Sequence, residues 1–217
     1  MKRVSDRIWW GIALIVVGAL LLLRNVLGGW VDREELFFGG LFAAAGLGFV
    51  VTYAANTKGR WWAIIPGCSL LGLGALLLMT SVSSALTDLV GGPMFLLAIA
   101  LAFVIVFLTE PARWWAVIPA GALASAAATA LVEELRLPFE GGAVMMFGLA
   151  ATFGLLALIA TPQGRMRWPL IPAGVLAAIG LLLLSESLRL GAFVWPIALV
   201  LVGAAFVLRS LKGAPRE

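Results

Sequence analysis

The chain of 217 residues is 63% hydrophobic and only 12% charged, with a formal net charge of +4. A soluble domain carries about 25% charged residues, so this composition excludes a water-soluble globular protein and predicts a membrane protein. The sequence has no histidine, which removes the commonest general base and the commonest metal ligand. We therefore expect no enzymatic activity, no cofactor and no metal site. No soluble stretch carries clustered bases, so we expect no nucleic-acid partner.

Long apolar runs follow one another along the whole chain. A helix needs about 20 apolar residues to cross a bilayer core of about 30 Å. The run after the basic start is too long for a cleavable signal peptide, so we expect it to be the first span. The predicted spans are 8–27, 36–55, 61–80, 92–109, 114–132, 142–160, 168–184 and 191–209.

A tryptophan-led motif recurs at a step of about 53 residues. It occupies 61–66 and 114–119, returns shortened at 168–172, and has a copy without proline at 9–12. Each copy opens a pair of apolar runs. This pattern predicts an all-α fold, a polytopic membrane helix bundle of eight transmembrane helices built from four tandem two-helix repeats. The repeats form one transmembrane domain over 1–217, with approximate bounds 7–56, 57–110, 111–162 and 163–211.

The tryptophans of the motif are expected at one membrane surface, because indole rings prefer the headgroup zone. An aromatic cage for a ligand is the alternative. The residues concerned are Trp61, Trp62, Trp114, Trp115 and Trp168.

Pro66, Pro119 and Pro172 follow the tryptophans about one turn inside their spans. Each removes a backbone donor and is predicted to bend its helix. A hinge of a transporter is the alternative to a fixed bend.

Small residues at four-residue spacing predict faces where helices approach closely. One stripe is Gly40, Ala44 and Gly48, and a second is Gly121, Ser125 and Thr129. The fifth span holds most such residues, so we expect it to be the most buried.

Two further patterns concern the ends and the interior of the spans. Glycine pairs at 39–40, 91–92 and 141–142 are predicted to lie where the outer loops end and the return spans begin. Hydroxyl side chains inside spans are expected to bond to carbonyls of their own helix; these are Thr52, Ser69, Ser125, Thr129 and Thr152.

The loops alternate in charge. The two termini and the loops after the second, fourth and sixth spans hold eleven bases and three acids, whereas the other loops hold four bases and eight acids. Short basic loops stay in the cytoplasm, which predicts a multi-pass protein of the plasma membrane with both termini cytoplasmic. Successive repeats then share one orientation, as a ring, an arc or two pairs of hairpins.

The acids of the less basic side allow one site hypothesis. Glu133, Glu134, Glu140 and Glu186 converge on a cation if the last two repeats are adjacent, because carboxylates suit Ca²⁺ or Mg²⁺. The alternative, which we prefer, is that they are helix caps and solvated charges.

The first and last spans carry a resemblance to a known family. Residues 9–18 with 21–25, and residues 193–203, place Trp-Gly or Trp-Pro before aliphatic residues and then Gly. This pattern resembles the membrane region of LiaI/LiaF-like bacterial envelope-stress proteins. The resemblance implies a bacterial membrane protein that acts by helix contacts, and it carries over no catalytic residue.

Two functions are open. The first is a non-enzymatic multi-pass membrane protein that acts by lateral helix contacts with lipids, with other membrane proteins or with copies of itself, as a regulatory, scaffold or accessory subunit. The second is a carrier or flippase for an apolar or zwitterionic small molecule or lipid, favoured by the repeated prolines.

Overall fold

The computed structural model describes residues 34–138, 140–161 and 164–187, together with Gly18, Val200 and Gly203, which are helical. The predicted first and eighth spans lie outside these residues, apart from the three single positions. In the described part the elements follow in the order α2 (Glu34–Ala55), η1 (Trp61–Ala63), α3 (Ile64–Val82), α4 (Ser84–Thr109), η2 (Trp114–Ala116), α5 (Val117–Glu134), α6 (Gly141–Leu158), β1 (Ala160–Thr161), β2 (Gly164–Arg165) and α7 (Leu170–Ser187). The segments η1 and η2 are single 3-10 turns, and β1 and β2 form a two-residue antiparallel pair.

Five helices of the described part are long and apolar enough to cross a bilayer. They are α2, η1 with α3, α4, η2 with α5, and α6, whereas α7 is apolar but shorter. The predicted helical class is therefore confirmed for the described residues, and the five apolar helices suggest a membrane protein. The span ends also agree closely: the predicted 61–80 and 114–132 are helical over 61–82 and 114–134.

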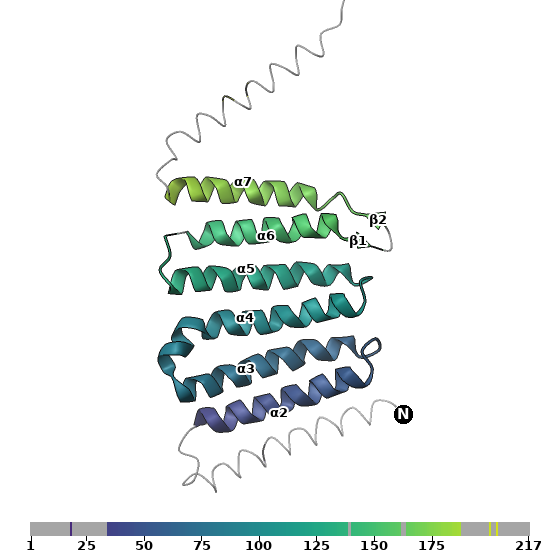
Figure 1. Ribbon diagram of the computed structural model, residues 1–217, viewed down its shortest axis with the longest axis vertical. Coiled ribbons are helices and arrows are strands. Elements are labelled where there is room, and N and C mark those ends of the chain that lie inside the picture. The colour runs from purple at the N-terminus through teal and green to yellow at the C-terminus, as the bar shows by residue number, and fades with distance from the viewer. Residues whose placement is uncertain are drawn as a thin grey trace, which may run out of the picture.

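Helix α4 departs from the prediction. It begins at Ser84 rather than near residue 92, and Ser83 is the single residue between it and α3. The backbone N–H of Leu86 donates to Oγ of Ser83 at 3.3 Å, which caps the helix start. The pair Gly91-Gly92 therefore lies inside α4, followed by the buried Pro93. Figure 1 shows the first turns of α4 crossing the end of the molecule before the helix aligns with its neighbours, as expected of a proline kink.

The other two glycine pairs differ from each other. Gly39-Gly40 lies inside α2, whereas Gly141-Gly142 begins α6. Only the last of the three pairs thus marks the start of a return helix. Gly39 is buried against α3. A Cβ added there would lie 2.9 Å from Cγ of Leu78 and 3.1 Å from the carbonyl oxygen of Gly74, so this glycine serves helix contact rather than a turn.

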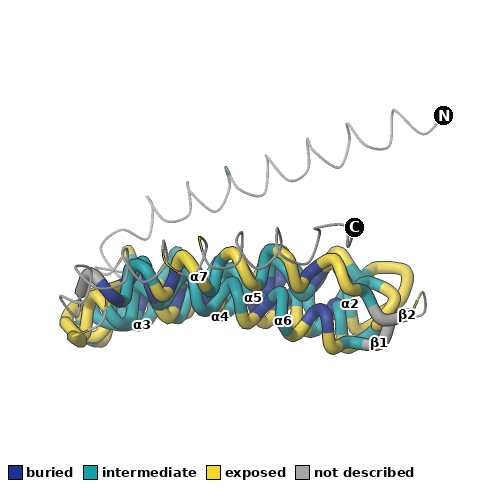
Figure 2. The backbone as a smooth tube through the Cα atoms, turned by 90° about the horizontal axis from the view of Figure 1, so that it is seen from above, coloured by how far each residue is buried: buried dark blue, intermediate teal, exposed yellow. Residues whose placement is uncertain are grey.

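The described helices form a row instead of a bundle around a common core. Figure 1 shows α2 to α7 side by side and antiparallel, in chain order, and Figure 2 shows the same row from above as a narrow slab. The main helix contacts are those between consecutive helices. The predicted bundle is therefore wrong for the described helices. Of the ring, the arc and the two pairs of hairpins predicted above, only the arc is open, as this row is. Small residues on two sides of a helix allow two neighbours, and large apolar residues cover the other sides.

Burial differs among the helices of the row. In the most apolar 18 residues of each span, 33% are buried in the span that contains α3, against 22% in the span that contains α5. The expectation that the fifth span is the most buried is therefore wrong. Alanines make α5 narrow, but they do not by themselves bring neighbours over it.

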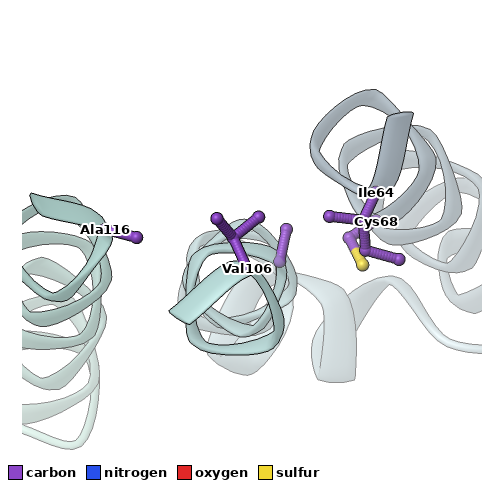
Figure 3. Close-up of a cluster of buried hydrophobic side chains, with 5 residues drawn as sticks. Ile64, Cys68, Val106 and Ala116 are labelled. Carbon is purple, nitrogen blue, oxygen red and sulfur yellow. The ribbon is translucent and has the colours of Figure 1, made fainter. Parts of the chain in front are cut away.

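A cluster of buried side chains lies where α3 begins, α4 ends and η2 leads into α5. Ile64 and Cys68 of α3 point toward α4, Ala116 of η2 approaches α4 from the other side, and Val106 lies between them (Figure 3). Ala102, Val106 and Ala116 have no exposed surface. This cluster fixes the positions of the helix ends that carry the tryptophans.

Charge is separated between the two edges of the row at which the helices begin and end; each edge is called an end below. Within the described residues, the end with the loops after α2, α4 and α6 carries five bases, Lys58, Arg60, Arg113, Arg165 and Arg167, and one acid, Glu110. We call it the basic end. The opposite, acidic end carries one base, Arg136, and seven acids, Glu34, Glu35, Asp88, Glu133, Glu134, Glu140 and Glu186.

Candidate functional site

The five predicted tryptophans gather at the basic end, and four of them form two pairs. Trp61 meets Trp115 at a centroid distance of 5.7 Å, and Trp114 meets Trp168 at 6.4 Å, both edge-to-face. The first tryptophan of one motif thus contacts the second aromatic position of the next. Three of the tryptophans also contact a phenylalanine at centroid distances of 6.2–6.3 Å: Phe49 on Trp62, Phe103 on Trp115 and Phe153 on Trp168. We call these eight side chains the aromatic edge.

The aromatic edge is built by the same local structure at two places. Trp61 and Trp114 each begin a 3-10 turn that ends at a fully buried alanine, Ala63 or Ala116. The alanine N–H donates to the carbonyl of the preceding arginine, Arg60 or Arg113, at 3.0 Å. The tight turn places two adjacent indole rings on different neighbours. Trp62 is 50% exposed and Trp115 is 37% exposed, so the rings contact each other and still face the surroundings.

Arg113 joins two loops at this end. Its guanidinium bonds to a carboxylate oxygen of Glu110 at 2.6 Å and donates through Nη2 to the carbonyl of Lys58 at 3.2 Å. It also lies over the ring of Trp61, 4.9 Å from the centroid, a cation–π arrangement. Its Nη1 is buried without a hydrogen-bond partner among the described residues. Nearby, the hydroxyls of Tyr53 and Thr109 lie 2.5 Å apart and link α2 to α4.

The three predicted prolines lie in the first turns of helices. Pro66 and Pro119 are the third residues of α3 and α5, after the 3-10 turns, and Pro172 is the third residue of α7. The first N–H groups of a helix have no partner within it, so a proline there removes no internal hydrogen bond. The predicted bend stays a prediction, whereas α4 has its proline inside the helix.

The predicted stripe on α2 does not contact α3. Gly40, Ala44 and Gly48 are exposed, and an added Cβ at either glycine would meet nothing within 4 Å. The contact uses the neighbouring face of α2. A Cβ at Gly46 would lie 2.8 Å from the backbone nitrogen of Leu71, and one at Gly74 would lie 2.8 Å from that of Ala43.

The α2–α3 contact thus relies on glycines in both helices. Gly39 and Gly46 on α2 are seven residues apart, as are Gly67 and Gly74 on α3, and all four are buried. The four-residue spacing that drew attention to Gly40 ignores this pattern. A search for paired glycines at seven-residue spacing in both helices of a hairpin would have found it.

The predicted stripe on α5 lies in the contact with α6. A Cβ at Gly121 would overlap with the side chain of Thr152, and one at Gly148 would overlap with that of Ser125. Each glycine therefore faces a hydroxyl residue on the other helix. Thr129 extends the same face, and its Oγ1 donates to the carbonyl of Gly141 at 3.3 Å.

The predicted hydroxyl bonds within helices are confirmed. All five side chains donate to the carbonyl four residues earlier, at distances between 2.7 and 3.0 Å; they are Thr52, Ser69, Ser125, Thr129 and Thr152. Since these donors are satisfied within their own helices, they offer little to a polar solute.

A groove of about 610 Å³ lies between α4, α5 and α6. Its wall is apolar except for Thr152, whose hydroxyl bonds to Gly148 at 2.8 Å. Sequence reasoning gave no sign of it, because it forms where alanines from two helices meet. The lining residues are Leu97, Ala100, Leu101, Val104, Phe107, Val117, Ala120, Gly121, Ala124, Thr152, Leu155 and Ile159.

The acids at the acidic end form no cation site in the part of the chain that the structure describes. No group of three or more acidic, cysteine or histidine side chains there is arranged to hold a metal. Glu140 precedes α6 without capping it through its side chain, and the side chain of Glu186 lies outside the description. Cys68 is buried in α3 and free.

Comparison with protein-family models, with curated proteins and with solved structures finds no match to this chain.

Proposed function

We propose that the protein is a non-enzymatic multi-pass membrane protein that acts through lateral contacts with lipids or other membrane proteins, as a scaffold, regulatory or accessory subunit. One observation carries this: large apolar side chains along the helix row are exposed to the surroundings. Leu47, Val51, Leu101, Leu108, Leu155 and Ile171 are each more than half exposed. Faces of this size and character mark interaction with a membrane or a partner.

The shape of the row supports contact over transport. Ion and proton pathways need ionisable side chains inside the spans, and the described spans have none at their centres. A row with contacts mainly between consecutive helices leaves each helix with much free surface. In lipid, further packing on that surface comes from close shape fit rather than from a hydrophobic driving force.

We also infer the finer organisation. It consists of four tandem hairpins, eight spans and cytoplasmic termini in a bacterial plasma membrane. The aromatic edge and the charge separation of the described residues support a shared orientation of the hairpins, and the resemblance of the first and last spans supports the bacterial assignment. Indoles beside arginines suit a cytoplasmic headgroup zone. Single cysteines in a Cys68→Ala background test the orientation. A cysteine replacing Gly59 should react only from the cytoplasmic side, and one replacing Pro138 only from the other side. Labelling of both from one side would contradict the arrangement.

Photo-crosslinking in native membranes tests the contact function. A photoreactive residue at Leu108, which is 69% exposed on α4, should give adducts with other proteins or with a second copy. The matched control is Val106 on the same helix, which has no exposed surface and should give only internal products. If photoreactive residues at Leu108, Val51 and Ile171 all give no intermolecular adducts, the result would count against protein contacts.

A carrier or flippase for an apolar or zwitterionic molecule is the second candidate, favoured by the groove between α4, α5 and α6. A liposome flux assay separates the two functions. Solute-specific flux that is lost in Pro119→Ala would favour the carrier, whereas absence of flux together with the Leu108 adducts would favour the contact protein.

A further inference from the structure

The groove occupies one half of the helix row. It extends along α4 from Leu97 to Phe107, along the first part of α5 from Val117, and along the last part of α6 to Ile159. All three stretches are the halves nearest the basic end. Ten residues of helix measure about 15 Å, and a bilayer core measures about 30 Å. The groove therefore has the depth of one lipid leaflet.

Two small residues leave this space open. By the repeat step of 53 residues, the position in α3 equivalent to Ala124 is Leu71, which packs on Gly46 of α2. The step of 54 residues between Phe49 and Phe103, which back equivalent tryptophans, places Ala100 where α2 has Gly46. The α2–α3 contact thus has a leucine over a glycine, whereas the α4–α5 contact has two alanines.

The wall suits hydrocarbon and little else. Thr152 contributes the only side-chain hydroxyl among the lining residues, and its bond to Gly148 is internal to α6. A void in an apolar surface costs its lining the dispersion contacts that a filling group would supply. A transmembrane helix is about 30 Å long, about twice the length of the groove, so a single acyl chain fits the available length better.

The basic end adds the charge that an anionic headgroup requires. Within the described residues this end has four more bases than acids. Arg113 is engaged by Glu110, Lys58 and Trp61. Arg167 lies in the loop after α6, is exposed, and makes no ion pair with the described residues. Basic residues beside spans attract anionic lipids.

We propose that the groove between α4, α5 and α6 holds one acyl chain of an anionic phospholipid whose phosphate lies at the basic end. The proposal rests on the membrane location proposed above and names the lipid class for one of its faces. The occupant is a structural lipid with defined orientation, seated in a single leaflet beside the aromatic edge.

Purified protein in nanodiscs tests the proposal. The probe is phosphatidylglycerol with a photoreactive diazirine in one acyl chain, and the sites of adduct formation are mapped by mass spectrometry. We expect adducts concentrated on Leu101, Ala124 and Leu155. Ala124→Leu, which installs the residue found at the equivalent place in α3, should remove most of them. Ala44→Leu, on the exposed face of α2, is the matched control and should leave them unchanged.

Competition with unlabelled lipid tests the headgroup without any substitution. Phosphatidylglycerol should displace the labelled lipid more effectively than phosphatidylcholine, and Arg167→Gln should weaken its binding by about fivefold, since one base near the surface has this effect. Equal competition by both lipids would overturn the anionic assignment. Adducts spread evenly over both faces, or unchanged adducts in a folded Ala124→Leu protein, would overturn the groove itself.

These outcomes are separable from failure of the proposed function. Crosslinking at Leu108 and Val51 reports partners in native membranes, whereas the nanodisc experiment contains only this protein and lipid. Adducts at Leu101 or Leu155 with another protein in native membranes would show a helix in the groove and would overturn the lipid proposal while supporting the contact function.

Discussion

Helices α3 and α5 begin alike and pack differently. Both follow a 3-10 turn of Trp-Trp-Ala, and both have a proline at their third position. Helix α3 then carries six leucines, and α5 carries two leucines and seven alanines. The leucines of α3 fill the space over the glycines of α2, whereas the alanines of α5 leave the groove. The opening motif fixes the position of a helix end, and the residues after it decide how closely its neighbours approach.

The two contacts also differ in what opposes each glycine. At α2–α3 two glycines lie on the backbone of the other helix, Gly46 against Leu71 and Gly74 against Ala43. At α5–α6 they lie on short hydroxyl side chains, Gly121 against Thr152 and Gly148 against Ser125. A backbone cannot retreat without moving its helix, but a side chain can be replaced. The first contact should therefore tolerate change less than the second.

The largest effect is expected at Gly46. A Cβ in Gly46→Ala would lie 2.8 Å from the nitrogen of Leu71 and 2.9 Å from the carbonyl oxygen of Gly67, so α2 and α3 must separate. We expect a loss of about 1–3 kcal/mol in the free energy of unfolding, as for other overpacked sites. Denaturation in mixed micelles measures it.

Gly48→Ala on the same helix is the control, because an added Cβ there meets nothing within 4 Å. It should be neutral or stabilising by up to about 1 kcal/mol, because alanine favours helix. Equal destabilisation by the two variants would show that the glycines act through the helix backbone and not through the contact.

Gly121→Ala should also destabilise, by about 1–2 kcal/mol, because its methyl overlaps with Thr152. Here a second substitution can restore the fit. Thr152→Gly should recover part of the loss in the double variant, less the cost of about 1 kcal/mol for glycine in a helix. A double-mutant cycle gives the coupling, and purely additive effects would contradict direct contact between the two residues.

Arg113→Gln tests the link between the ends of α3 and α5. It removes the cation from the ring of Trp61 and the ion pair with Glu110, and we expect a loss of about 1 kcal/mol. Tryptophan fluorescence should change as well, because the guanidinium lies over Trp61, which in turn contacts Trp115. The matched control is Arg60→Gln at an exposed position, whose spectrum and stability should stay close to those of the parent protein.

The smallest effect is expected from Ser125→Ala. Its Oγ donates at 2.7 Å to Gly121 of its own helix, so removing it leaves no donor on α6 unpaired, and the loss should stay below about 1 kcal/mol. Thr129→Val removes a bond of 3.3 Å to Gly141 across the two helices and should cost more in the same unfolding assay. The reverse order would assign the α5–α6 contact to Ser125.

Much of this fold could be predicted from hydropathy, but the packing could not. Apolar run lengths gave the ends of α3 and α5 within two residues, because a helix in lipid ends where the apolar residues end. The start of α4 was wrong because Gly91-Gly92 usually marks a turn, and here a serine cap lies eight residues earlier. The predictions of a bundle and of the stripe on α2 were wrong for a related reason. Gly40 and Gly39 are equally small, and only the position of α3 decides which one is buried.

The aromatic edge shows the same limit for the site. A preference of indole for the headgroup zone predicts where Trp61 and Trp115 lie, but not that they touch. Their contact depends on the 3-10 turns and on the buried alanines that end them. The groove depends on alanines from two consecutive helices, Ala100 of α4 and Ala124 of α5.

The connection of each helix to its immediate predecessor has a consequence for synthesis. When the chain enters a bilayer in order, each helix from α3 to α7 finds a consecutive neighbour already in place, and its second neighbour follows directly. No segment between α2 and α7 has to wait for a distant one before its glycines or alanines are covered. Truncation after α3 or after α5 should therefore leave nascent chains with hairpins already formed, and stalled ribosome complexes offer a direct way to observe them.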